Sequence, residues 1–464
     1  MSISAALSNA VSGLRANSTA SDLISRNIAN SSTEGYTRKT VKLTTQDGNV
    51  RVASVDRQVS SLLDKLDRSN VSKLSARQTV AEGVSAYTDV LGQPEDSVSP
   101  SALLSELKSS LITLSNSPDQ GSSQLAVVSA AKEFASQMQN LSGTIDTVAA
   151  EVEMNIRYDV ADVNAALYEV AKLNSAIAAS AEGSTIRAEL SDQMGQALDT
   201  LSSYMDVQTV TSKTGQVSVL TSGGTELVSG KTVNDVTYND GTGVLMAGDV
   251  EITPGTGARG FSEGSLSGLF ELKNEVLPTI LDQLDAVAAA AIEGFERVAP
   301  ITTDGRGLFT DAGSAYDAAS IDGLAGRIAV NVDADPDLGG SPAIVQSGSI
   351  ATTPSSDSTL PAAMVNLFDE IVAVPTANIG GTETLSALSA SLVTNHQQIR
   401  IDAETSAETI SVSAATVSTS RQNLQGVNID DEMQQLLLVE KSYAANAKVL
   451  TTVNSMLDTL LDAF

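Results

Sequence analysis

Residues 3–30 read ISAALSNAVSGLRANSTASDLISRNIAN, and residues 428–461 read NIDDEMQQLLLVEKSYAANAKVLTTVNSMLDTLL. In both stretches apolar residues recur at alternating steps of four and three, which is typical of a helix that buries one narrow stripe against a second helix. We expect two long terminal helices that pair with each other as a coiled coil. The chain between them must leave this helical layer and return to it.

The stripes contain a few polar positions. In the first helix the stripe comprises Ile3, Leu7, Ala10, Leu14, Asn17, Ser21, Ile24 and Ile28. In the second it comprises Ile429, Met433, Leu436, Glu440, Tyr443, Ala447, Leu450, Asn454, Leu457, Leu461 and Phe464, with Val439 and Val453 beside the two polar exceptions. Asn17 and Asn454 either set the register, as a buried Asn does in coiled coils, or turn to solvent. Asn428 is placed to cap the second helix.

The middle of the chain alternates between helical and β patterns. Long Ala-, Leu- and Val-rich stretches predict helices, while β-branched alternation between Gly-rich turns predicts strands. We expect a mainly α protein with β insertions: a terminal coiled coil, a helical-bundle middle domain and one or two small β-rich domains. The predicted parts are 1–57 with 426–464 (coiled coil), 58–206 with 262–299 and 376–425 (helical), 207–261 (β insertion) and 300–375 (second β-containing insertion).

The composition argues against several classes of function. The chain has 27 basic and 56 acidic residues, so its net charge of −29 repels nucleic-acid phosphates and anionic lipid. It has no Cys and one His, which excludes disulfides, thiolate metal sites and most imidazole catalysis. No apolar run approaches the length of a membrane span, and the N-terminus lacks the regions of a cleaved signal peptide. We expect a structural protein with no cofactor, no nucleic-acid partner and no membrane partner.

Three weaker patterns are best explained without a ligand. The string from Gly255 to Gly260 matches G-x-G-x-x-G, but no helix begins inside it, so a loop is expected. The alternating aspartates at 333, 335 and 337 start like a calcium-binding loop, but Leu338 and Ile344 replace its turn glycine and bidentate glutamate. His396 lies in a polar helical stretch and is expected to be solvated.

The string NIANSSTEGYTRKTVKL at residues 27–43 resembles the N-terminal motif of the flagellar rod, hook and hook-associated proteins. The string from Gly426 to Leu461 resembles the C-terminal helix of the same group. Residues 111–145 and 163–177 resemble the helical domain of the hook-associated protein 1 family. The N-terminal likeness is carried by Asn27, Asn30, Thr33, Gly35, Tyr36 and Arg38, and the C-terminal likeness chiefly by Asn428, Asp431, Glu432, Met433, Tyr443, Ala447, Lys448 and Met456.

This resemblance implies a structural adaptor of the bacterial flagellum that joins hook to filament. It implies export in an unfolded state through the flagellar type III channel, assembly as a ring through the terminal helices, and an extracellular place at the hook–filament junction. The implied partners are further copies of the chain, the hook protein, a second junction protein, and an export chaperone on the C-terminal helix. The expected subunit-interaction residues are Leu7, Leu14, Ile24, Asn27, Ile28, Asn30, Gly35, Tyr36, Arg38, Asn428, Glu432, Met433, Leu436, Tyr443, Leu450, Leu457 and Leu461.

Two alternatives stay open at this point. A hook or distal-rod protein would be favoured by a strand-dominated segment after residue 58. An acidic secreted enzyme or a carbohydrate-binding protein would use the β insertions instead. The chain also looks short for the family, so we expect an outer domain to be reduced or missing.

Overall fold

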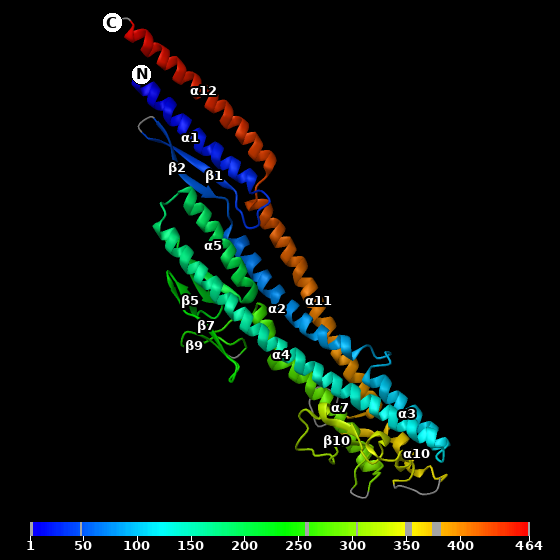
Figure 1. Ribbon diagram of the computed structural model, residues 1–464. Coiled ribbons are helices and arrows are strands. Elements are labelled where there is room, and N and C mark those ends of the chain that lie inside the picture. The colour runs from blue at the N-terminus through cyan, green and yellow to red at the C-terminus, as the bar shows by residue number, and fades with distance from the viewer. Residues whose placement is uncertain are drawn as a thin grey trace. The chain divides into compact units, whose positions relative to one another are not determined.

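The computed structural model describes residues 3–46, 49–255, 259–302, 305–348, 355–373 and 382–462. Long helices dominate it (Figure 1), which confirms the predicted mainly α fold with β insertions. The long helices are α1 (Ile3–Ala29), α2 (Ser61–Leu91), α3 (Pro100–Asn116), α4 (Gly121–Ala179), α5 (Thr185–Tyr204), α7 (Leu277–Val298), α11 (Leu385–Gln425) and α12 (Ile429–Leu461). The short ones are α6 (Ser265–Glu271), a π-helical turn (Leu272–Val276), α8 (Leu324–Arg327), a 3-10 turn (Pro336–Leu338), α9 (Ile344–Ser347) and α10 (Thr359–Leu367).

Local sequence explains where these helices begin and end. Ser99 caps α3 by accepting a hydrogen bond from the Ala102 N–H at 3.2 Å, and Pro100 occupies the first turn, where its missing N–H costs nothing. Ser184 caps α5 in the same way. Just before Pro278 the backbone is π-helical, because the proline cannot donate to the regular ladder.

A β-hairpin follows α1 directly and packs against it. β1 (Lys39–Gln46) and β2 (Asn49–Arg57) run antiparallel, from Lys39 opposite Arg57 to Gln46 opposite Asn49. The terminal-helix pattern does not predict this hairpin, because residues 1–57 were expected to form only the coiled-coil part. After residue 58 the chain is helical, since α2 begins at Ser61, so the observation that would favour a hook or rod protein is not met.

The first β insertion holds two antiparallel sheets. In the first sheet the strand order is β3-β4-β5-β6, with β3 at its edge, and in the second it is β7-β8-β9. Their bounds are β3 (Val207–Thr211), β4 (Val217–Thr221), β5 (Glu226–Ser229), β6 (Thr232–Val233), β7 (Val236–Asn239), β8 (Val244–Ala247) and β9 (Val250–Glu251). The second insertion has two small pairs, β10 (Phe309–Asp311) with β11 (Ile328–Val330) and β12 (Ile371–Ala373) with β13 (Thr382–Thr384).

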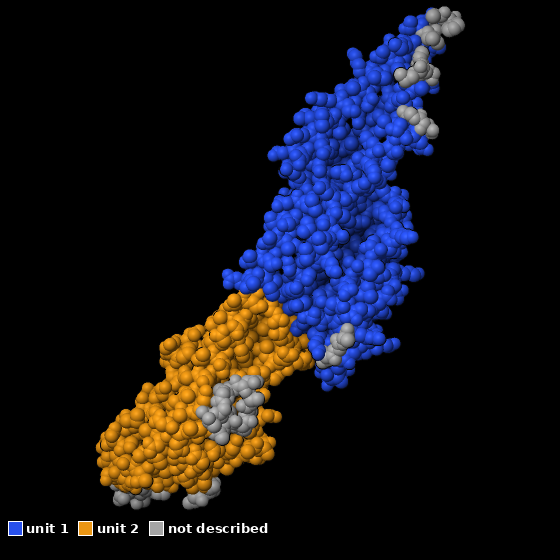
Figure 2. Space-filling view, turned by 180° about the vertical axis from the view of Figure 1, so that it is seen from behind, with its two compact units in different colours: residues 1–76, 157–267, 408–464 blue, residues 77–156, 268–407 orange. Residues whose placement is uncertain are grey.

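The chain forms two compact units (Figure 2). Unit 1 comprises Met1–Ala76, Arg157–Ser267 and Glu408–Phe464, and unit 2 comprises Arg77–Ile156 and Gly268–Ala407. Each of α2, α4 and α11 therefore contributes residues to both units. The finer four-part division expected from the sequence stays a prediction.

The largest fully buried aromatic side chains lie in the core of unit 2. Phe295 makes edge-to-face contacts with Phe309 and Phe368, at ring-centroid distances of 5.3 and 6.1 Å, and Phe134 contacts Phe309 at 5.5 Å. Since Phe309 lies on β10, this cluster fastens the second β insertion to α4 and α7.

The expectation that His396 is solvated is wrong. Its side chain is completely buried in unit 2, where Nδ1 lies 3.0 Å from the Tyr87 hydroxyl and Nε2 lies 2.9 Å from the Gln283 carbonyl oxygen. Burial lowers the pKa of His396 from 6.5 to about 3, so the ring is neutral. The polarity of the neighbouring residues does not decide burial here, since Gln397 is also buried whereas Gln398 is exposed.

Acid should therefore weaken unit 2. The unfolded chain binds a proton at His396 below pH 6.5 and the folded chain does not, so this contribution to stability is present above pH 6.5 and is lost as the pH falls towards about 3. We expect the free energy of unfolding of unit 2 to fall between pH 6.5 and 5, by up to about 1.4 kcal/mol per pH unit, and its melting temperature to fall with it. His396→Gln, which cannot titrate, should flatten this dependence in thermal melts. An unchanged slope in the variant would contradict the assignment.

Candidate functional site: the terminal helix pair and its polar junction

α1 and α12 lie side by side and antiparallel in unit 1 (Figure 1), as the sequence predicts for the two ends. Two cross-contacts set their register. The Asn17 amide donates to the Ser442 hydroxyl at 3.0 Å. One turn earlier in α1, a Cβ on Gly13 would lie 2.7 Å from the Asn446 amide nitrogen, so the absent side chain lets the helices approach closely.

The stripe of α12 that faces α1 is only half predicted by the sequence pattern. Leu436, Leu450 and Leu457 are partly buried, as expected. The positions between them are displaced by one residue: Glu440 and Asn454 are exposed, while Val439 is partly buried and Val453 is 6% exposed. In the stripe that contacts α1, the step after Leu436 is three residues, to Val439, rather than four, to Glu440. The apolar neighbours of the polar exceptions were the informative residues.

The two stripe asparagines behave differently. Asn17 is partly buried and bonded to Ser442, whereas Asn454 turns to solvent. Register-setting by a polar side chain therefore fits Asn17 and does not fit Asn454. Asn446, which faces Gly13, is a partly buried polar residue of α12 within the helix contact, as Asn17 is in α1.

Asn27, in the last turn of α1, joins three elements through one amide group. It is 1% exposed. Its Nδ2 donates to the Lys39 carbonyl at 2.9 Å and to Glu432 Oε2 at 3.0 Å. Its Oδ1 accepts from the Lys39 N–H at 3.2 Å and from the Tyr36 hydroxyl at 2.9 Å. Every donor and acceptor of the amide is used, which links the end of α1 to the start of β1 and the start of α12.

Glu432 supplies the charge of this junction. Its side chain is 1% exposed, and Oε1 accepts from Arg38 Nε at 2.7 Å. The carboxylate thus has one charged and one amide partner from the N-terminal motif, as a buried charge requires. Burial, followed by the nearby carboxylates, raises the pKa of Tyr36 to about 12, so its hydroxyl stays a donor to Asn27.

A second buried cluster, around Asp192 of α5, was not predicted. Its carboxylate accepts from the Thr37 hydroxyl and from Arg57 Nε, both at 2.6 Å, and forms an ion pair with Lys39. Lys39 Nζ also lies 3.6 Å from the ring centroid of Tyr36. Burial lowers the pKa of Lys39 against the opposing effect of Asp192. Thr37 and Lys39 lie inside the quoted 27–43 string, but no sequence signal marks Asp192, which is more than 150 positions away.

The turn after α1 and the start of α12 are built by local contacts. Asn30 donates to the Arg26 carbonyl at 2.9 Å. Gly35 has a φ of +72°, which favours glycine, and a side chain there would also meet Gln196. Asn428 caps α12 by accepting from the N–H groups of Asp430 and Asp431 at 3.0 and 3.4 Å, which confirms the expected cap.

The proposed subunit-interaction residues fall into three groups by burial. Ile24, Asn27 and Glu432 are buried, while Leu7, Leu14, Ile28, Asn30, Gly35, Tyr36, Arg38, Leu436, Leu450 and Leu457 are partly buried within the single chain. Asn428, Met433, Tyr443 and Leu461 are exposed. The side chains of Ile3 and Phe464 lie outside the described part of the chain.

Much of the apolar surface of α12 is not covered by α1. On the sides that face away from the helix contact, Leu437 is 54% exposed, Leu438 66%, Val449 45% and Met456 55%. Soluble single chains rarely leave so many large apolar side chains exposed along one helix. This side of α12 is therefore an apolar surface without cover in the described part of the chain.

The weaker sequence patterns form no ligand site among the described residues. Asp333 pairs with Arg306, and Lys132 pairs with Asp335 and Asp337, so the three aspartates are held by cations of the chain itself. Part of the Gly255–Gly260 string lies outside the described residues. In the described ranges no cluster of three or more His, Asp or Glu is placed to hold a metal ion, and no helix there is long and apolar enough to cross a membrane.

Removing the Glu432 carboxylate should loosen the helix pair. Glu432→Ala leaves Arg38 and Asn27 without their partner, which costs about 3–5 kcal/mol for a buried ion pair. We expect faster amide hydrogen exchange throughout α1 and α12. Asp431→Ala removes an exposed carboxylate one residue earlier and is the matched control. Equal exchange in the two variants would mean that the junction does not hold the pair.

Three family models match the chain. The flagellar hook-associated protein FlgK helical domain matches residues 84–311, the flagella basal body rod protein family matches 7–37, and the flagellar basal body rod FlgEFG protein C-terminal family matches 419–463. The two rod-protein matches cover most of α1 and all of α12, the two helices of the pair. The FlgK match covers much of the helical middle of the chain.

Two relatives with similar sequences are both named flagellar hook-associated protein 1. Flagellar hook-associated protein 1 of Bacillus subtilis is 23% identical over 521 aligned positions that cover 98% of this chain and 97% of the relative. That of Escherichia coli is 22% identical over 562 positions, covering 99% and 100%. Both alignments have more positions than this chain has residues, so both relatives carry segments that this chain lacks.

Among solved structures, the flagellar hook junction protein FlgK from Burkholderia pseudomallei matches with a TM-score of 0.43 and 22% identity, over 54% of this chain and 45% of that one. The family models at both ends and in the middle, together with relatives aligned over nearly the whole length, identify this chain as a member of the hook-associated protein 1 family of flagellar structural proteins.

Proposed function

We propose that this chain joins the flagellar hook to the filament as a ring of subunits assembled through the terminal helices. The observation that carries the proposal is the exposed apolar surface of α12, which one partner helix cannot cover. Its neighbours in the proposed ring are further copies of the chain. The hook protein on one side and a second junction protein on the other complete the set of partners.

The energetics favour packing between copies. Burying each exposed leucine or methionine of α12 would contribute about 1.5–3 kcal/mol. The surface that α12 presents differs from that of α1, so a contact between neighbouring copies would join two different surfaces, head to tail. Such a contact closes into a ring when the rotation between neighbouring copies fits a whole number of times into a full turn. The helix pair leaves large apolar side chains of α12 exposed, which suits a chain that is exported unfolded and completes its packing on assembly.

A hook or distal-rod protein is the second candidate. The family matches at the two ends belong to rod-protein models and are shared by the whole group. The FlgK helical-domain match at residues 84–311 and the helical chain after residue 58 favour the hook-associated role.

The proposed junction role can be tested in cells. In a strain that lacks this chain, we expect electron micrographs to show hooks without filaments and filament protein released into the medium. Hooks that still carry filaments would contradict the junction role, and the absence of hooks would favour the rod or hook alternative.

Assembly should depend on the outward apolar side of α12. Leu438→Asp places a carboxylate where we propose an apolar contact between copies, and an unpaired buried charge there would prevent assembly. Because Leu438 is 66% exposed, the thermal transition of the monomer should hardly change. We expect exported but unincorporated protein and non-motile cells.

Leu338→Asp is the matched control, since Leu338 is 65% exposed in the second β insertion. It should assemble normally. Normal motility in the Leu438→Asp strain would show that the outward side of α12 is not a subunit contact.

Before assembly, we propose that an export chaperone covers the same apolar side chains of α12. Deleting residues 429–464 should abolish co-purification with that chaperone. A double substitution, Leu437→Ser with Leu438→Ser, should weaken binding, whereas Leu338→Ser should not. Undiminished binding by the truncated chain would place the chaperone site elsewhere.

A further inference from the structure

A groove of about 610 Å³ lies in unit 1 between α1 and β2. Its wall on α1 includes Leu7, Val11 and Arg15, which are spaced four residues apart and therefore lie on one face of the helix. Gly13 and Asn17, which face α12, lie on another face of α1. The β-hairpin and α12 accordingly contact different sides of α1 (Figure 1), so the groove is separate from the contact between α1 and α12.

The floor of this groove is apolar and open to solvent. Val11 of α1 and Val50 and Val52 of β2 line it, and Val52 is 36% exposed. The Ser8 hydroxyl donates to the Asn49 side-chain oxygen at 3.0 Å and joins the two walls. The walls are thus held together while apolar side chains between them stay accessible, which fits the apolar side chains of a partner.

Two arginines line the groove, and no carboxylate does so among the described residues. Arg15 and Arg51 are both exposed, and neither has an ion pair within the described part of the chain. The one acidic residue of α1, Asp22, lies about two turns beyond Arg15 and is paired with Arg26. The two guanidinium groups therefore give the groove an unpaired positive charge.

Unpaired charge of the opposite sign lies at the other end of the chain. Residues 1–57 contain seven basic and four acidic residues, although the whole chain has a net charge of −29. Residues 428–464 contain two basic and six acidic residues. The exposed carboxylates of α12 that have no ion pair among the described residues are those of Asp430, Asp431, Glu440 and Asp458. Attraction between the two ends of different copies follows from this distribution.

α12 combines these carboxylates with the apolar surface that an apolar groove requires. Leu437, Leu438, Val449 and Met456 are exposed on the same helix. A contact between the groove of one copy and α12 of the next would join two different surfaces, as a closed ring of identical subunits requires. The groove also lies on α1, the helix that already packs against α12 within each chain, so the contact would extend the helix pair.

We propose that this groove binds α12 of a second copy of the chain. Apolar side chains from the outward side of α12 lie over Val11, Val50 and Val52, and carboxylates of the same helix pair with Arg15 and Arg51. The inference rests on the proposed assembly between copies and adds the surface of the neighbour that α12 meets.

Photo-crosslinking in assembled flagella identifies the occupant of the groove. The photoreactive residue p-benzoylphenylalanine replaces Val11, and the irradiated product is digested and analysed by mass spectrometry. We expect two chains joined between this position and a residue within 429–461. The same replacement of Asn17, which faces α12 of its own chain, should give a link within one chain. If the Val11 variant is not incorporated, Ser4, an exposed residue at the end of the groove, takes its place.

The identity of the crosslinked partner decides the result. A link from the groove to the hook protein, to any other protein, or to a part of the second copy outside α12 would overturn the proposal. The absence of any link in assembled flagella would also overturn it. None of these results would contradict the junction role, which the loss of filaments in cells without this chain tests separately.

Charge reversal tests the role of the two arginines. Arg15→Glu with Arg51→Glu places like charges opposite the carboxylates of α12, and we expect at least about tenfold less chain in immunoblots of isolated flagella. Because both arginines are exposed and unpaired, the melting temperature of the free chain should hardly change.

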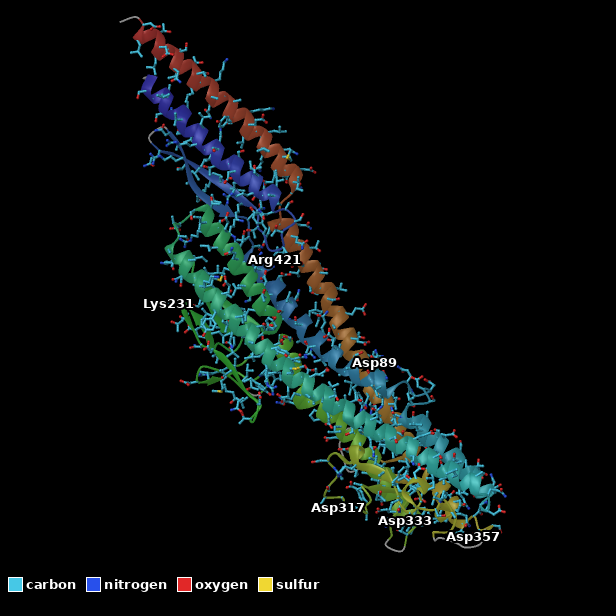
Figure 3. All side chains as sticks on the ribbon, viewed as in Figure 1. Asp89, Lys231, Asp317, Asp333, Asp357 and Arg421 are labelled. Atoms are coloured by element: carbon cyan, nitrogen blue, oxygen red, sulfur yellow. The ribbon has the colours of Figure 1, made fainter. Side chains whose placement is uncertain are left out.

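Lys42→Glu with Lys231→Glu is the matched control. It makes the same change of charge at two exposed lysines that do not line the groove, of which Figure 3 labels Lys231. We expect incorporation within about twofold of the unsubstituted chain. Equal losses in the two double variants would show only a general effect of charge and would overturn the pairing of α12 with the arginines.

Discussion

The buried contact between Asn27 and Glu432 holds the two ends of this chain together. The residues are 405 positions apart, and both side chains are almost completely buried. Burying a carboxylate and an amide is unfavourable unless each hydrogen-bonding group has a partner, and here Lys39, Tyr36 and Arg38 complete the set. A network of this kind is satisfied in one arrangement only. It therefore defines where α1 ends, where β1 begins and how α12 starts.

The rest of unit 1 follows from that arrangement. α1 has α12 on one side and the β1–β2 hairpin on another, so little of its apolar surface is left exposed. Within the described ranges, α12 has an extensive contact with α1 alone and keeps large apolar side chains in solvent. This asymmetry leaves apolar surface for the neighbours that we propose, because the helix fixed by the junction presents its remaining surface outward.

The few basic residues of this acidic chain serve largely as internal ties. Arg38 pairs with Glu432, and Lys39 and Arg57 pair with Asp192. Arg421, which Figure 3 labels on α11, pairs with Asp64, Asp67 and Asp199 of α2 and α5. Partly buried ion pairs contribute little net stability but penalise alternative packings in which a charge loses its partner. Using cations internally also leaves the net charge of −29 to the rest of the surface.

The sequence by itself determined the elements that depend on local chemistry. The apolar steps marked α1 and α12, Asn428 marked the cap of α12, and the change to β-branched alternation marked the first β insertion. The quoted motifs also identified the family. The helical stripe does not predict the β1–β2 hairpin, because its period ends with α1; the signal for the hairpin is the alternation in TVKLTT and VRVASV on either side of the sequence pair Asp47-Gly48, which favours hairpin turns.

Only the tertiary structure decided which side of each helix is used. Val439 and Val453 contact α1 in place of Glu440 and Asn454. Steps of three and four can be placed in either order along a helix, so the repeat alone does not say which residues face the partner helix. His396 is buried by α2 and α7, although its neighbours in sequence are polar. Asp192 joins the junction from α5 across more than 150 residues. Such contacts arise from packing between distant segments, and no local pattern encodes them.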